Sequence, residues 1–142
     1  TNFVLEELAK GQPYEAVMEE GRRRGFVEAD PSMDLDGWDA AAKLTALLNV
    51  LMDADITPMD IDRTGIGSVT AEQMAEAAER GKVIKLLCRG WREDGVVRAS
   101  VQPVEVERGN LLAAIVVAVI IAIIVATSIR FKTGDCHVVN SD

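Results

Sequence analysis

The spacing of apolar residues predicts helices in the first third of the chain. Apolar side chains crowd one side of a short helix that stops at Gly11, and Pro13 opens a second helix that stops at Gly25. A third helix is predicted over residues 38–52, where apolar residues recur at helical spacing. Between the second and third helices, residues 26–37 are rich in Asp, Pro and Gly, which predicts a loop.

The segment after residue 60 predicts one short strand and one further helix. Residues 61–69 have the composition of a strand followed by a turn. Thr70 and Gln73 have the spacing of a capping box, which predicts that a helix follows. This helix should run from residue 71 to about residue 80, because Gly81 is a typical C-terminal stop.

Two longer strands are predicted in the next part of the chain. Residues 82–91 and 96–106 alternate in the manner of strands, and the turn Arg92-Glu93-Asp94-Gly95 would join them as a hairpin. Helices followed by strands indicate an α+β domain rather than an alternating α/β one. We therefore expect helices packed on a mostly antiparallel or mixed sheet.

An apolar run over residues 111–129 leaves two interpretations open. It contains no charged residue and is long enough for a membrane helix. Isoleucine and valine dominate it, however, and β-branched residues favour strands, so buried strands would give the same pattern. We expect strands over residues 123–128 and 136–139 rather than a membrane helix, because nothing else in the chain indicates a membrane.

Composition and charge narrow the class of protein. The chain has 142 residues, of which 49% are hydrophobic, enough for one domain with a core. Its net charge of -8 argues against nucleic acid as a partner, since no basic stripe is present. Cys88, Cys136 and the single histidine, His137, match neither a zinc site nor a disulfide framework. Reduced cysteines and the lack of a signal-peptide pattern lead us to expect a cytoplasmic protein without a metal.

Candidate chemistry is concentrated in an acidic segment between the second and third predicted helices. Five carboxylates lie close together there, at Glu28, Asp30, Asp34, Asp36 and Asp39. Such a group repels itself unless a cation balances it. Lys43 follows Asp39 by four residues on the predicted helix, so the two share one face. The alternative is a solvated capping loop with an ordinary surface ion pair, and the spacing does not match that of a calcium loop.

The order of residues in this segment is specific. Gly25-Phe26-Val27-Glu28-Ala29-Asp30-Pro31 is followed by Asp34-Leu35-Asp36-Gly37-Trp38-Asp39-Ala40-Ala41-Ala42-Lys43-Leu44. This order resembles the signature of the homoserine dehydrogenase family. Shorter matches lie at Thr1-Asn2-Phe3-Val4-Leu5, Thr64-Gly65-Ile66, Lys82-Val83-Ile84-Lys85-Leu86-Leu87, Pro103-Val104-Glu105-Val106 and Asn110-Leu111-Leu112-Ala113. The resemblance implies a substrate and catalytic domain over residues 1–114, with residues 115–142 as an apolar C-terminal segment whose strands complete the sheet.

The resemblance also implies an activity and roles for five residues. The family interconverts L-homoserine and L-aspartate 4-semialdehyde with NAD or NADP, in the amino acid biosynthesis that leads to threonine and methionine. Glu28 and Asp34 match the carboxylates that hold the substrate's ammonium group, and Thr1 matches a substrate-contacting threonine. Lys43 matches the lysine that handles the hydroxyl proton, and Asp39 would orient it.

The chain departs from the family in one major respect. The family's N-terminal half binds the cofactor through a Gly-rich turn between a strand and a helix, and it supplies a second catalytic lysine; neither has a counterpart here. Gly65-Ile66-Gly67 indicates only a turn. We therefore expect the chain alone to have no dehydrogenase activity. The alternative is a non-catalytic amino-acid-binding or oligomerisation module derived from the family. We expect a homodimer through the sheet, because the apolar strands need cover.

Overall fold

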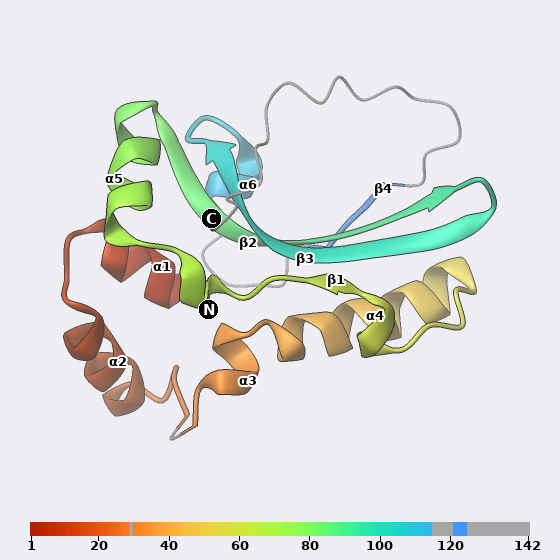
Figure 1. Ribbon diagram of the computed structural model, residues 1–142, viewed down its shortest axis with the longest axis horizontal. Coiled ribbons are helices and arrows are strands. Elements are labelled where there is room, and N and C mark those ends of the chain that lie inside the picture. The colour runs from red at the N-terminus through yellow and green to blue at the C-terminus, as the bar shows by residue number, and fades with distance from the viewer. Residues whose placement is uncertain (29, 115–120, 125–142) are drawn as a thin grey trace.

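The computed structural model describes residues 1–28, 30–114 and 121–124, and it has the expected α+β architecture (Figure 1). The helices are α1 (Asn2–Ala9), α2 (Tyr14–Arg23), α3 (Ser32–Leu35), α4 (Trp38–Met52), α5 (Ala71–Glu79) and α6 (Leu111–Ala114). The strands are β1 (Asp62–Arg63), β2 (Lys82–Glu93), β3 (Val96–Glu107) and β4 (Ile121–Ile124). Two 3-10 turns, η1 (Pro58–Asp60) and η2 (Ile66–Ser68), flank β1.

The strands form one mixed sheet in the order β1-β3-β2-β4. Its centre is the antiparallel hairpin of β2 and β3, and the outer strands β1 and β4 each run parallel to their neighbour. The hairpin turn has only two residues, Asp94 and Gly95, whose φ angles are 51° and 82°. Two central residues with positive φ match the twist of the strands, so β2 and β3 extend further than predicted, to Glu93 and Glu107.

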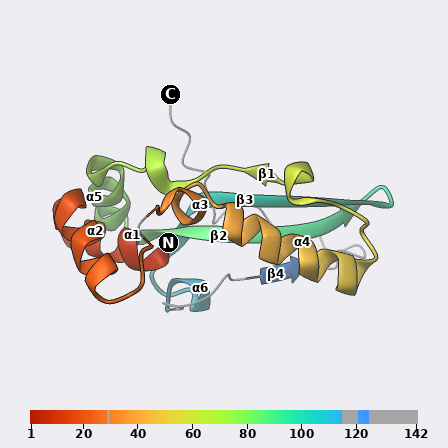
Figure 2. The ribbon, with the colours of Figure 1, turned by 90° about the horizontal axis from the view of Figure 1, so that it is seen from below.

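The longer helices lie in two places around the sheet. Helix α4 runs alongside the sheet, whereas α1, α2 and α5 gather at one end of it (Figures 1 and 2). The main core lies between α4 and the hairpin, where Leu44 and Leu48 are fully buried. Burying a leucine side chain stabilises a fold by about 1.5–3 kcal/mol. This packing therefore fixes α4, and every group that it carries, against the sheet.

Several predicted element boundaries agree with the structure. Helix α4 spans the predicted residues, and α5 begins with the predicted capping box. In that box the Gln73 N–H donates to Thr70 Oγ1 at 3.2 Å, and the Thr70 N–H donates to Gln73 Oε1 at 2.9 Å. Gly11, Gly25 and Gly81 follow helix ends with positive φ, as expected of C-terminal glycines.

The prediction of an unbroken loop over residues 26–37 was wrong. Residues Ser32–Leu35 form the single helical turn α3. Pro31 precedes this turn, the carboxylate of Asp30 accepts a hydrogen bond from the Ser32 N–H at 3.1 Å, and Leu35 is buried in the core. These local bonds and one anchored side chain support a turn too short to show a helical period in sequence.

The apolar C-terminal region is described only in part. Helix α6 and strand β4 lie within it, and β4 overlaps the predicted strand over residues 123–128 at Ile123 and Ile124. The predicted strand over residues 136–139 lies outside the described residues. None of the helices in the described part of the chain has the length and apolar character that crossing a bilayer requires.

Candidate active site

Asp34 and Thr1 meet although 33 residues separate them in sequence. The α-ammonium group of Thr1 lies 2.7 Å from Oδ2 of Asp34. The Thr1 hydroxyl also donates to Oδ1 of Asp34, and it lies 3.2 Å from the backbone oxygen of the same residue. Helix α3 carries Asp34 and α1 follows Thr1, so this contact joins the first helix to the acidic segment.

The surroundings of Asp34 favour its charged form. Partial burial raises the pKa of the Asp34 carboxyl, but the ammonium and hydroxyl groups of Thr1 and the charge of Lys43 outweigh it. The pKa of Asp34 is therefore lowered from its ordinary value. A carboxylate in these surroundings is ionised near neutral pH, and it can hold a cation.

Asp39 and Lys43 form an ion pair on the outer face of α4. Lys43 Nζ lies 2.6 Å from Asp39 Oδ2, and the two side chains are 57% and 49% exposed. The predicted spacing of four residues thus places them on one face. Because the charge of Lys43 also lowers the pKa of Asp34, the lysine lies close enough to act on both carboxylates.

Glu28 lies between α2 and α3 and is exposed. It makes no hydrogen bond or ion pair with any residue that the structure describes. The structure therefore brings Thr1, Asp34, Asp39 and Lys43 into one neighbourhood, whereas no contact among the described residues joins Glu28 to them.

Cys88 lies on β2, near enough to the ion pair for the charges of Asp39 and Lys43 to act on its thiol. Its side chain is 1% exposed, and burial together with the charge of Asp39 raises the pKa of its thiol to about 11. Such a thiol stays protonated near neutral pH and is a poor nucleophile. We therefore assign Cys88 to the core and not to the chemistry of the site.

The joint between α3 and α4, residues 36–38, rests on the predicted strand and turn of residues 61–69, a contact that sequence reasoning missed. Arg63 of β1 donates to the backbone oxygen of Asp36, and its Cζ lies 3.7 Å from the centroid of the Trp38 ring. Gly65 lies so close to the same joint that a Cβ there would be 2.5 Å from the backbone oxygen of Leu35. Nothing in the sequence links Arg63 to this joint, because the contact spans 27 residues.

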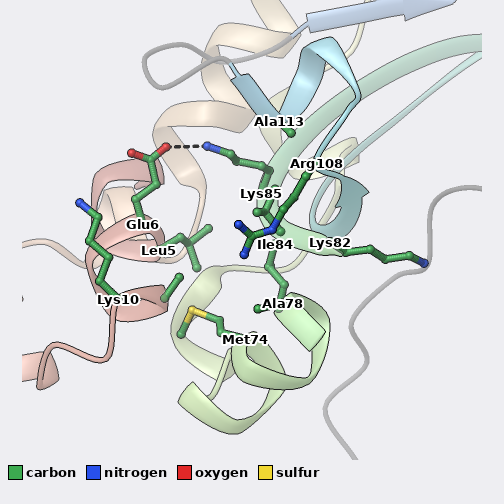
Figure 3. A pocket seen from close by; sticks show the side chains of 12 residues that line it. Leu5, Glu6, Lys10, Met74, Ala78, Lys82, Ile84, Lys85, Arg108 and Ala113 are labelled. Atoms are coloured by element: carbon green, nitrogen blue, oxygen red, sulfur yellow. Dashed lines mark hydrogen bonds and ion pairs between the residues drawn. The ribbon is translucent and has the colours of Figure 1, made fainter. Parts of the chain in front are cut away.

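A cavity of about 350 Å³ lies elsewhere, between α1, α5 and β2 (Figure 3). Its wall contains the 3% exposed Lys85, whose Nζ lies 2.5 Å from Oε1 of Glu6. None of the five predicted site residues lines this cavity. It is separate from the acidic segment.

The described residues contain no group of three or more His, Cys, Asp or Glu placed to hold a metal ion.

The fold and the site geometry define an α+β domain that presents a carboxylate and an ion-paired lysine on two joined helices. A family model described as homoserine dehydrogenase matches residues 1–132. The homoserine dehydrogenase of Bacillus subtilis is 33% identical over 116 residues, which cover 81% of this chain and 27% of that protein. The chain belongs to the homoserine dehydrogenase family.

Two further relatives agree with this assignment. A protein of Pseudomonas canavaninivorans named NAD(+)-dependent homoserine dehydrogenase is 31% identical, over 81% of this chain and 33% of its own length. The crystal structure of S. aureus homoserine dehydrogenase at pH 6.0 superimposes with a TM-score of 0.74 and 38% identity, over 80% of this chain and 30% of that one. The chain thus spans a third or less of these relatives.

Proposed function

We propose that this chain is the substrate-binding and proton-transfer part of a homoserine dehydrogenase, which interconverts L-homoserine and L-aspartate 4-semialdehyde. One observation carries the proposal: the Thr1 hydroxyl donates to the Asp34 carboxylate, and the charge of Lys43, which is paired with Asp39, also acts on that carboxylate. Homoserine carries an ammonium group on its α-carbon, which an ionised carboxylate can hold.

Each remaining site residue has a role in the proposal. Glu28 is exposed and makes no bond to a described residue, so its carboxylate is available as a second partner for the substrate's ammonium. Lys43 is paired with Asp39 at 2.6 Å. In the reducing direction its ammonium form would give a proton to the aldehyde oxygen, and in the oxidising direction its neutral form would take the hydroxyl proton. Asp39 holds Lys43 on the outer face of α4, towards Asp34.

The redox half of the reaction needs a nicotinamide cofactor, and we assign its binding to a part of the enzyme other than the described residues. The cofactor would be NAD or NADP, and one relative is named as NAD(+)-dependent. We therefore propose that the 142 residues alone bind substrate without turning it over.

We also propose a cytoplasmic homodimer that serves the biosynthesis of threonine and methionine. Residues 1–114 would form its substrate domain, and residues 115–142 would complete the sheet.

Calorimetric titration of the chain with L-homoserine tests the proposal. We expect binding that Asp34→Asn and Glu28→Gln each weaken at least about tenfold, since each removes a charged hydrogen-bond acceptor. The matched controls are Asp55→Asn and Glu19→Gln, which alter exposed acids elsewhere on the surface. Equal affinity in the site variants and the controls would show that the acidic segment does not bind the ligand.

Two analogues separate the two halves of the site. γ-Hydroxybutyrate lacks the ammonium group, so it should lose the contribution of Asp34 and Glu28. α-Aminobutyrate lacks the hydroxyl, so it should keep that contribution, and its affinity should not depend on Lys43. Tighter binding of γ-hydroxybutyrate than of α-aminobutyrate would contradict the assignment of Asp34 to the ammonium group.

The second candidate function is an amino-acid-binding or oligomerisation module without redox chemistry. The exposure of Lys43, at 57%, favours it, because a proton-transfer lysine usually works in a site from which water is excluded. The two candidates differ in what Lys43 does. Joining the chain to a cofactor-binding domain should produce reduced nicotinamide from homoserine, and Lys43→Met should abolish this, if the first candidate holds. Unchanged binding with no turnover in the joined protein would favour the second.

A further inference from the structure

The joint formed by residues 36–38 decides how Asp34 and Lys43 lie relative to each other. Asp34 is on α3 and Lys43 is on α4, and only Asp36 and Gly37 lie between these helices. A helix of four residues has little stability of its own. Gly37, with φ 79°, begins α4 without a side-chain cap. The position of Asp34 therefore depends on whatever holds this joint.

Arg63 contacts all three residues of the joint. A Cβ built on Gly37 would lie 3.6 Å from Cγ of Arg63, so the aliphatic part of the arginine passes beside Gly37. Its guanidinium group donates through Nη1 to the backbone oxygen of Asp36 and stacks on Trp38 at 3.7 Å. A planar guanidinium can make the ring contact and the hydrogen bond together, which an ammonium group cannot do equally well.

The strand that carries Arg63 is itself held firmly. Arg63 is in register with Val101 of the central strand β3, and the Thr64 N–H donates to the Val101 backbone oxygen at 2.8 Å. The side chain of Gln102 donates to Asp62 Oδ2 at 2.7 Å. The joint is thereby tied to the middle of the sheet, against which α4 also packs.

Arg63 does not act on Asp34 through its charge. The groups that lower the pKa of Asp34 are the ammonium and hydroxyl of Thr1 and the charge of Lys43, and Arg63 is not among them. A change at Arg63 should therefore alter where Asp34 and Lys43 lie and leave the ionisation of Asp34 much as it is.

We propose that Arg63 is a positioning residue, which clamps the joint of α3 and α4 and so sets the distance between the ammonium-binding Asp34 and the proton-transferring Lys43. This inference rests on the proposed function for its consequence, but the clamp itself is a property of the free chain. The two parts can therefore be tested separately.

Hydrogen–deuterium exchange of the full 142-residue chain without ligand tests the clamp. In Arg63→Ala, we expect the amides of residues 36–41 to exchange at least about fivefold faster, while those of β2 and β3 stay protected. Arg63→Lys keeps the aliphatic contact and one donor, so it should show an intermediate effect. The control Arg98→Ala removes an exposed arginine of β3 that pairs with Glu93, and it should leave these amides unchanged. Two results would overturn the proposal. One is unchanged exchange of residues 36–41 in Arg63→Ala, and the other is faster exchange of all amides, those of β2 and β3 included, in both Arg63 variants.

Calorimetry with L-homoserine then tests the consequence. Arg63→Ala should bind about tenfold more weakly than the unmodified chain, and added methylguanidinium should restore part of its affinity. Arg98→Ala should bind as tightly as the unmodified chain, with or without methylguanidinium. Full affinity in Arg63→Ala would overturn the positioning role. If the unmodified chain does not bind homoserine while exchange changes as expected, the proposed function fails and the clamp stands.

Discussion

Replacing Gly65 by alanine should destabilise the chain through one short contact. The Cβ of alanine would lie 2.5 Å from the backbone oxygen of Leu35 and 2.6 Å from Cα of Asp36. Both atoms belong to the backbone of the joint, so no side-chain rotation can relieve the overlap. Forcing extra atoms into a well-packed site costs about 1–3 kcal/mol.

Part of this loss is offset in the unfolded chain. The φ angle of Gly65 is -76°, which alanine adopts without strain. Alanine therefore gains about 0.4–1 kcal/mol by reducing the freedom of the unfolded state. The expected net change is a loss of about 1.3 kcal/mol in the free energy of unfolding, within a range of about 0–2.6 kcal/mol.

Urea denaturation at equilibrium measures this change, and Gly67→Ala is the matched control. A Cβ at Gly67 would meet nothing within 4 Å, and Gly67 lies only two residues along the same segment. The control should be as stable as the unmodified chain or slightly more stable. If Gly65→Ala proves as stable as Gly67→Ala, the close approach of this segment to the joint is not real.

Two further predictions concern Asp34 and Cys88. Because the folded-state pKa of Asp34 is lowered, its stabilising contribution is present above the unfolded pKa near 3.8 and is lost as pH falls through the folded pKa. Asp34→Asn should therefore lose less stability than the unmodified chain as the pH falls below about 3.8. Thermal unfolding at several pH values measures this, and an equal fall in the melting temperature of the two chains would contradict it. In a Cys136→Ser chain, Cys88 should resist thiol reagents at neutral pH until urea unfolds the protein, because burial raises the pKa of its thiol; rapid labelling of the folded chain would refute its place in the core.

The local elements of this chain follow closely from its sequence. The apolar period over residues 38–52 predicts α4 with its observed ends, and the pair Thr70 and Gln73 predicts the start of α5. Asp39 and Lys43 share a face because four residues make slightly more than one helical turn. These features depend on contacts within a few residues, which a sequence displays directly. The order of acidic residues gave the family in the same way, and the family match over residues 1–132 confirms it.

The assembly of the site depends on contacts that a sequence does not display. The bonds between Thr1 and Asp34 span 33 residues, and the clamp of Arg63 on the joint spans 27. Helix α3 forms in a segment whose composition predicts a loop, because Leu35 is anchored in a core made by other elements. The packing of α1, α4 and β1 on the hairpin brings these groups together. The sequence by itself therefore determined which residues carry the charge, whereas the tertiary structure decided which charges meet, since long-range distances follow from how the elements pack.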